Sequence, residues 1–358
     1  MSARFSSADD AETPWWRPER HADRRPALLA RARITSALRA YLEAQGFLMV
    51  DVPGLQVSPG NETHLHAFST MMIGEDGTSR VMHLHTSPEF TLKKLLAAGE
   101  TRIASLGHVW RNRERSARHH PEFTMLEWYR KDEPYDAVIA DTVALIRLAA
   151  ETAGTTLLRY KGQEADVTLP PERIGVVEAF RQHAGIDLFE TMDASGATDG
   201  RALAAQMAKV GMKVPKEENW SLLFSLILTE KVEPKLGMGR ITILDRYPAA
   251  EAALARRVPG DARLAERFEV YGAGVELANG FGELTDPDEQ RRRFEAEMAE
   301  KQRLYGETYP LDEDLLAALP LIGEASGVAL GFDRLVMLAV GAPSIEHVLW
   351  APVAGGRG

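Results

Sequence analysis

The apolar positions of the chain alternate between helical and strand-like spacing and predict a mixed domain. From Pro26, apolar side chains recur every three or four residues until Gly46, which predicts a first helix. The apolar run 47–50 is followed by Pro53 and is typical of a strand that stops at a proline. Residues 1–22 are polar and contain prolines, so we expect a flexible N-terminal arm ahead of the helix.

Further strands and helices follow the same two patterns along the chain. We expect strands at 81–85, 103–110, 123–129, 240–244, 267–277 and 328–330, and helices at 88–96, 136–152, 288–305 and 335–340. A long polar loop joins the strands at 103–110 and 123–129, which indicates an antiparallel pair. Strands that pair with their sequence neighbours, mixed with helices, favour an α+β fold over a parallel βαβ array.

Composition narrows the class of protein without identifying its chemistry. The 358 residues are 45% hydrophobic and 26% charged, as expected for a globular protein that can bury a large core. We expect a cytoplasmic protein without membrane spans, because neither a long uncharged apolar run nor a secretory signal is evident. The absence of cysteine excludes disulfides and cysteine-ligated zinc. The net charge of −10 argues against broad nonspecific binding to nucleic acid.

An arginine-rich loop between the two paired strands is the first candidate for chemistry. Arg111 leaves the end of an apolar strand, where an unpaired guanidinium would be costly. Five more donors follow within nine residues: Arg113, Arg115, Arg118, His119 and His120. So many donors can neutralise a polyphosphate. A structural ion pair at Arg111, a solvated surface loop or an RNA-contacting loop would also produce this pattern.

A second arginine in a similar setting ends the segment Gly327-Val-Ala-Leu-Gly-Phe-Asp-Arg334. The guanidinium of Arg334 could lie over one face of an adenine while the ring of Phe123 stacks on the other. Alternatively, Phe123 belongs to the core, and Gly327 and Gly331 reflect close packing of a helix on a strand. The segment matches neither the P-loop nor the dinucleotide-binding fingerprint.

Acidic residues gather in the glycine-rich segment that ends at Glu283. Gly272 and Gly274 predict a hairpin turn, which could place Glu269 and Glu276 side by side. Paired carboxylates are a reasonable Mg²⁺ site, since Mg²⁺ takes one or two carboxylates together with phosphate oxygens. Glu283 lies in an otherwise apolar turn and could receive an ammonium group.

Together these segments resemble the three motifs of the class II aminoacyl-tRNA synthetases, and most closely their lysine-specific branch. Residues 46–53 look like motif 1, residues 110–129 like motif 2 and residues 327–334 like motif 3. The resemblance covers about residues 25–350. It implies an antiparallel β-sheet flanked by helices.

The resemblance also implies one catalytic domain at 23–358, in which about 155–235 connects motifs 2 and 3. Lysyl-tRNA synthetases carry a β-barrel anticodon-binding domain before motif 1, and about 25 residues are too few for one, so we expect no anticodon recognition. The chain is similar instead to a truncated branch whose members attach (R)-β-lysine to a lysine of elongation factor P. Ser87 and Ala329 stand where lysyl-tRNA synthetases usually have alanine and glycine, and they would reshape the pocket on the scale of amino-acid discrimination.

The resemblance implies a role for each matching residue. Arg111 would bind the α-phosphate and the amino-acid carboxylate, and Phe123 and Arg334 would clamp adenine. Arg118 and His119 would contact the outer phosphates, and Glu269 and Glu276 would hold Mg²⁺. Glu89 would bind the backbone-type amine of the substrate. Its distal ammonium group would be surrounded by Glu283, Tyr129 and Asn279.

The implied reaction uses ATP and Mg²⁺. It activates (R)-β-lysine, or lysine, as an aminoacyl-adenylate and transfers the acyl group to a lysine ε-amine of elongation factor P. Motif 1 lies at a two-fold interface in such folds, so we expect a homodimer.

One position departs from the family pattern. Motif 2 usually reads Arg-x-Glu, whereas this chain has Arg111-Asn112-Arg113 and places Glu114 one residue later. The missing glutamate normally helps to orient the nucleotide, so the departure affects the predicted adenine contacts. Two other functions stay open: a truncated enzyme that loads lysine onto RNA or another carrier, and a noncatalytic regulatory subunit that keeps the fold and the pocket.

Overall fold

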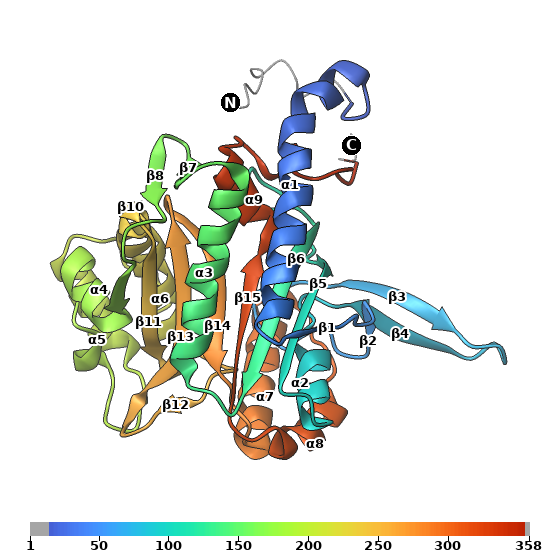
Figure 1. Cartoon of the computed structure of the whole chain (residues 1–358). Helices are drawn as coiled ribbons and strands as arrows, with labels where there is room; N and C mark the ends of the chain where they lie inside the picture. The colour runs from blue at the N-terminus through green and yellow to red at the C-terminus, as the bar shows by residue number, and fades with distance from the viewer. Residues whose placement is uncertain (1–13, 355–358) are drawn as a thin grey trace.

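A central sheet of nine strands organises the computed structural model, which describes residues 14–354 (Figure 1). In sheet order the strands are β1 (Leu48–Met49), β5 (Arg102–Trp110), β6 (Glu122–Lys131), β15 (Ala325–Gly331), β14 (Val275–Gly282), β13 (Asp261–Gly272), β11 (Thr242–Pro248) and β9 (Glu172–Gly175), with β12 (Arg257–Val258) paired to β13. The strands from β5 to β11 are antiparallel to their neighbours. Only β1 and β9, at the two ends of the path, pair in parallel. The predicted α+β class and antiparallel sheet are therefore confirmed.

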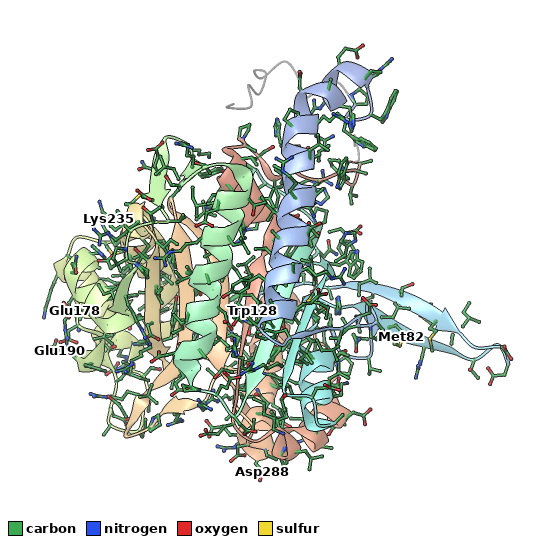
Figure 2. The ribbon with its side chains drawn as sticks, in the orientation of Figure 1. Met82, Trp128, Glu178, Glu190, Lys235 and Asp288 are labelled. Carbon is green, nitrogen blue, oxygen red and sulfur yellow. The ribbon has the colours of Figure 1, made fainter. Side chains whose placement is uncertain are left out.

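Three helices pack on one face of the sheet and build the largest part of the core. They are α1 (Pro18–Ala44), α3 (Tyr135–Ala153) and α9 (Phe332–Val340). Leu126, Trp128, Val328 and Leu330 are buried in the same cluster, and Figure 2 shows Trp128 in the middle of this layer. Side chains alternate along a strand, so the residues between them face the other side of the sheet. That second face carries the candidate site.

The first helix begins at Pro18 rather than Pro26, eight residues earlier than its pattern predicts. A proline fits the first turn of a helix, where its missing N–H has no partner to lose. The buried side chain of Arg24 hydrogen-bonds a backbone carbonyl near the C-terminal end and anchors the extra turns. Residues 18–22 of the predicted arm are therefore helical, and residues 1–13 lie outside the described residues.

Two further groups of helices pack around separate apolar clusters. One group comes from the predicted connecting region and packs beside β9 and β11: α4 (Val176–Ala184), α5 (Gly200–Lys209) and α6 (Trp220–Ile227). The other lies below the sheet in Figure 1: α2 (Glu89–Ala97), α7 (Pro287–Tyr305) and α8 (Glu313–Ile322). Within residues 14–354, every helix is too short or too polar to cross a membrane.

Two small sheets lie outside the central one. The first contains β7 (Leu157–Tyr160), β8 (Gln163–Asp166) and β10 (Gly239–Arg240), and the second contains β2 (Leu55–Gln56), β3 (Phe68–Ile73) and β4 (Ser79–Leu84). The β3–β4 hairpin projects away from the body of the molecule (Figure 1). Met82, labelled in Figure 2, is buried on its β4 strand. Met71, Ile73 and Val81 are exposed.

Candidate active site

A cavity of about 200 Å³ gathers most of the predicted site residues on the second face of the sheet. Ten of them line it: Ser87, Glu89, Arg111, Arg118, His119, Phe123, Glu276, Asn279, Ala329 and Arg334. Three more, Tyr129, Glu269 and Glu283, are buried and do not line it. Tyr129 and Glu283 are connected to the lining residues Ser87 and Glu89 through Glu127 and Lys93. The segments that carry them are far apart in sequence, so the sheet brings them together.

The register of the sheet aligns these residues in rows. Glu269 pairs with Asn279, Asn279 with Ala329, and Ala329 with Glu127. In the neighbouring row, Gly327 pairs with Tyr129. Residues that pair across antiparallel strands point to the same face, so strands from motifs 2 and 3 and from the acidic hairpin present their side chains to one floor.

A β-bulge places Glu276 and Asn279 on the same face although they are three residues apart. The pairing of β13 with β14 shifts between Val270 and Tyr271, so that Tyr271 pairs with Glu276 while Glu269 pairs with Asn279. On a regular strand an odd spacing would put the two side chains on opposite faces. The predicted hairpin turn at Gly272 and Gly274 is confirmed. The bulge puts Glu276 and Asn279 on one face, which strand alternation alone would not do.

A buried lysine connects two of the predicted amino-acid ligands. The Nζ atom of Lys93 lies 2.6 Å from Oε1 of Glu89 and 2.6 Å from Oε2 of Glu283. Burial disfavours the charged form of Lys93, but Glu283 and Glu89 outweigh this effect and raise its pKa. The two carboxylates are thereby held in fixed positions by one cation.

A buried carboxylate that sequence reasoning missed, Glu127, lies beside this pair. Its oxygens accept hydrogen bonds from the Ser87 hydroxyl at 2.5 Å and from the Tyr129 hydroxyl at 2.6 Å. Glu127 precedes Tyr129 by two residues on β6, and Lys93 follows Glu89 by one helical turn. Lys93 was also missed by sequence reasoning. Strand periodicity around Tyr129 and helix periodicity around Glu89 were the signals that could have indicated Glu127 and Lys93.

The pocket around these carboxylates favours an additional positive charge. Burial, reinforced by repulsion from Glu89, raises the pKa of Glu127 to about 8. Burial raises the pKa of Glu283 to about 7, although Lys93 opposes the shift. Oε1 of Glu283 is buried and accepts no hydrogen bond from any residue within 14–354. An ammonium group placed here would gain partners that the protein itself does not supply.

Gly327 of motif 3 makes room for this pocket. A Cβ atom at this position would lie 2.2 Å from Cε1 of Tyr129 and 2.8 Å from Oε1 of Glu283. The close packing around Gly327 is therefore against the pocket residues Tyr129 and Glu283.

Two guanidinium groups face the other part of the cavity. Nε of Arg111 donates to the carbonyl of Thr86 at 3.2 Å, and its guanidinium carbon lies 5.4 Å from the centre of the Phe123 ring. Nη1 of Arg334 donates to the carbonyl of Glu276 at 3.1 Å and to Oε2 of that residue at 3.3 Å. Nε of Arg334 also donates to the carbonyl of Arg118 at 3.3 Å. Both Nη atoms of Arg111 and Nη2 of Arg334 therefore stay available to a ligand.

The positive field at this end acts on His119. Burial and the neighbouring Arg334, Arg118 and Arg111 lower the pKa of His119 to about 4, so its imidazole is neutral at pH 7. Its Nδ1 atom lies 2.7 Å from the hydroxyl oxygen of Ser116, with which it shares a hydrogen bond. The second ring nitrogen can therefore act as a neutral hydrogen-bonding group beside three guanidiniums.

The departure from the motif 2 pattern has a clear structural result. Arg113 has a left-handed backbone conformation, with φ of 66°, and its side chain forms an ion pair with Glu307. The ring of Tyr305 lies 5.8 Å from its guanidinium carbon. Glu114, by contrast, lines the cavity. The arginine at the unusual position is turned outward, and the next residue brings a carboxylate to the cavity.

The carboxylates Glu269 and Glu276 lie on the same face of the β13–β14 hairpin and are two residues that could hold a magnesium ion. Glu269 accepts hydrogen bonds from Arg267 at 2.7 Å and from the Tyr271 hydroxyl at 2.6 Å. Burial raises its pKa against the opposing effect of Arg267. Burial and repulsion from Glu269 and Glu276 also raise the pKa of Glu233, from the connecting region, to about 7. Sequence reasoning missed this third nearby carboxylate.

This architecture, with arginines of two strand-associated motifs facing an acidic pocket on an antiparallel sheet, is that of a class II synthetase catalytic domain. The family model described as "tRNA synthetases class II (D, K and N)" matches residues 13–354, and the chain belongs to this family.

Several curated relatives are similar over nearly the whole chain and carry one name, elongation factor P–(R)-β-lysine ligase. The protein from Klebsiella pneumoniae strain 342 is 37% identical over 341 residues, which are 95% of this chain and 98% of the relative. The protein from Salmonella gallinarum is 38% identical, with the same coverage. The protein from Vibrio cholerae is 36% identical over 91% of this chain and 94% of its own.

Proposed function

We propose that this protein is an ATP-dependent ligase that activates (R)-β-lysine, or lysine, as an aminoacyl-adenylate and transfers the acyl group to a lysine ε-amine of elongation factor P. The observation that carries the proposal is one cavity lined by the guanidinium groups of Arg111, Arg118 and Arg334 and by the buried carboxylate of Glu89, with the buried carboxylates of Glu127 and Glu283 behind it. ATP and a diamino acid have these complementary charges. Relatives of nearly equal length that bear this name support the choice of acceptor.

The phosphate end of the cavity would stabilise the first half-reaction. Arg111 would bind the α-phosphate and the amino-acid carboxylate, while Arg118 and neutral His119 would contact the outer phosphates. Phe123 and Arg334 would hold adenine between them. The substrate carboxylate then attacks the α-phosphorus, so catalysis consists of positioning and of neutralising the developing charge.

Glu114 would supply the nucleotide-orienting carboxylate that motif 2 otherwise provides. The support is that Glu114 lines the cavity, whereas Arg113 is exposed and paired with Glu307. We therefore propose that the substitution at position 113 moves this function by one residue and does not abolish it.

Glu269 and Glu276 would hold Mg²⁺, which supplies neutralisation of phosphate charge when bound. The ion pair between Arg334 and Glu276, at 3.3 Å, would have to open for both groups to reach their ligands. Opening of this ion pair would thus accompany nucleotide binding.

The acidic end would select the amino acid. Glu89 would bind the backbone-type amine, and Glu283, Tyr129 and Asn279, together with Glu127, would surround the distal ammonium group. Ser87 and Ala329 line the cavity and set its dimensions.

We also propose a cytoplasmic homodimer. Apolar side chains around motif 1 and on the neighbouring hairpin are exposed, among them Leu48, Leu55, Val57, Met71 and Ile73. Exposed apolar side chains gathered on neighbouring segments are typical of a protein interface.

The decisive experiment is amino-acid-dependent ATP–pyrophosphate exchange with α-lysine, both enantiomers of β-lysine and unrelated amino acids. We expect exchange to be strongest with (R)-β-lysine and to collapse in Arg334→Ala. Absence of exchange with every lysine-like compound would contradict the ligase function. Transfer is then tested on elongation factor P and on a variant whose acceptor lysine is replaced by arginine.

A further inference from the structure

A second cavity adjoins the first and meets it at Glu62. It has a volume of about 700 Å³ and is lined by the 62–65 segment and by residues of α6 and α7. The two cavities share four lining residues: Glu62, Leu65, Asn279 and Phe281. Glu62 is the one titratable side chain among these four, so it faces the adenylate site and the second cavity together.

The carboxylate of Glu62 is not occupied by other protein groups. Neither of its oxygens accepts a hydrogen bond from the residues that the structure describes. The neighbouring carboxylates differ in this respect: Glu89 is bonded to Lys93, Glu127 to Ser87 and Tyr129, and Glu297 to Thr63. Glu62 is therefore available to a group that enters the junction.

The backbone around Glu62 is firmly held, so the availability of its side chain does not come from a loose loop. Nζ of Lys301, whose side chain is fully buried, donates to the carbonyls of Leu65 at 2.6 Å, Thr63 at 3.0 Å and Glu62 at 3.4 Å. The amide of Thr63 donates to Glu297 on α7 at 2.9 Å. A carboxylate fixed in this way is positioned before a ligand arrives.

Four charged groups on four elements act on Glu62. They are Glu89 of α2, Arg111 after β5, Glu297 of α7 and Arg267 of β13. Burial and repulsion from Glu89 raise the pKa of Glu62 to about 7, and Arg111 opposes them. A base of this strength is half ionised near neutral pH, where it can both accept and release a proton.

We propose that Glu62 is the catalytic base of the transfer step and takes a proton from the acceptor ammonium group, which approaches through the second cavity. This inference rests on the proposed function. A lysine ε-amine is protonated at neutral pH and cannot attack an acyl carbon until it loses a proton. Arg111, assigned to the α-phosphate, lines the same cavity as Glu62, so the base shares that cavity with the reacting acyl group.

The ammonium group gives one proton to the carboxylate of Glu62, and the freed lone pair attacks the acyl carbon of the adenylate. The new C–N bond forms as the bond from the acyl carbon to the phosphate oxygen breaks, and AMP leaves with that electron pair. The second proton of the nitrogen passes to the phosphate of the departing AMP, and Glu62 releases its proton to solvent.

The test separates the two half-reactions in Glu62→Gln, with Glu251→Gln as the matched control. Glu251 is half-buried like Glu62, lines the second cavity but not the first, and has its pKa raised by burial to about 7. We expect Glu62→Gln to keep pyrophosphate exchange within about threefold, and to slow single-turnover transfer to elongation factor P by roughly 100-fold, the usual scale for loss of a general base. Glu251→Gln should transfer at nearly the wild-type rate.

A small acceptor provides the second measurement. Hydroxylamine is uncharged at neutral pH and needs no base, so hydroxamate formation from the preformed adenylate should be equal in Glu62→Gln and the wild type. The wild-type transfer rate should rise with pH through about 7, and the variant should lose this dependence.

Three results would overturn the proposal. They are equal loss of exchange and transfer, unchanged transfer in Glu62→Gln, and equal loss in Glu251→Gln. Failure of the proposed function has a different signature, because the wild type itself would then show no exchange or no transfer.

Discussion

At the residue scale, Arg113 and Glu114 show how a neighbouring residue can compensate for one substitution within a motif. A regular backbone would direct Arg113 toward the cavity, where its charge would add to Arg111. The left-handed conformation at Arg113 and the ion pair with Glu307 turn this charge outward. Glu114 is then the carboxylate of the loop that faces the cavity.

We predict that Glu114→Gln raises the KM for ATP roughly tenfold, because one hydrogen bond to a charged group is lost. The KM for the amino acid should change little, since its pocket lies at the other end of the cavity. Steady-state pyrophosphate exchange measures both constants. Arg113→Ala is the control and should change the KM for ATP less than about twofold, because exposed ion pairs contribute little. A larger effect for Arg113→Ala than for Glu114→Gln would contradict this assignment.

The residues of the candidate site could be predicted from the sequence only where they stand at positions of a known motif. Arg111, Arg334 and Asn279 stand at motif positions, and the structure brings them to one cavity. The contact of Lys93 with Glu283 is different, because it joins residues 190 positions apart and leaves no local pattern. The roles of the gathered residues toward ATP, Mg²⁺ and the amino acid stay predictions.

At the scale of the elements, the central strands and the amphipathic helices were predictable because one face of each is buried. β3 was missed because it projects into solvent, and five of its six residues are exposed. Without a buried face a strand has no apolar alternation to detect. α8 was missed because Pro320 lies inside it, and an internal proline argues against a helix.

Gly327 on β15 provides a test of how tightly the sheet fits the pocket. We predict that Gly327→Ala lowers the free energy of unfolding by about 1–3 kcal/mol, since Tyr129 and Glu283 must move to admit the new methyl group. The KM for the amino acid should rise more than the KM for ATP. Chemical denaturation and exchange kinetics measure the two effects. In Gly107→Ala on β5, the nearest atom would be 4.0 Å away, so this control should change stability little.

At the scale of the whole molecule, buried and half-buried carboxyl groups make stability depend on pH. Glu62, Glu251 and Glu283 have pKa values of about 7, and Glu127 of about 8, each raised mainly by burial. The unfolded chain releases these protons near pH 4.5, whereas the folded chain keeps them until pH 7–8. Stability from these groups is therefore complete at low pH and is lost as pH rises through their folded-state values.

We predict that the melting temperature of the ligand-free protein falls between pH 6.5 and 8.5. Glu127→Gln should make the melting temperature depend less steeply on pH. The substitution replaces the carboxyl group with the highest of the four pKa values by an amide that does not titrate. Differential scanning calorimetry across this range measures the slope. A melting temperature that rises with pH over this interval would show that these carboxyl groups do not control stability.

The proposed dimer depends on the apolar surface around motif 1. Leu55 is 43% exposed and Ile73 is 71% exposed. We predict that Leu55→Glu combined with Ile73→Glu yields a monomer at micromolar concentration, whereas the wild type has the mass of a dimer. Light scattering after gel filtration measures the mass. Leu321→Glu, at an equally exposed position on α8 (65%), is the control and should leave the mass unchanged. A monomeric wild type would contradict the dimer.

The bulge in the β13–β14 hairpin also bears on how the chain finds its correct pairing while it folds. Two regular pairings compete with the bulged one. If pairing continued regularly from the turn, Asn279 would lie opposite Phe268 in the apolar layer, and if it continued from the far end, Glu276 would point into that layer. Either error buries a polar group without partners and costs several kcal/mol. Glu276 and Asn279, which the proposed chemistry needs, therefore also destabilise the two incorrect strand pairings. A variant with apolar residues at both positions would form incorrect pairings more often and would also lose activity.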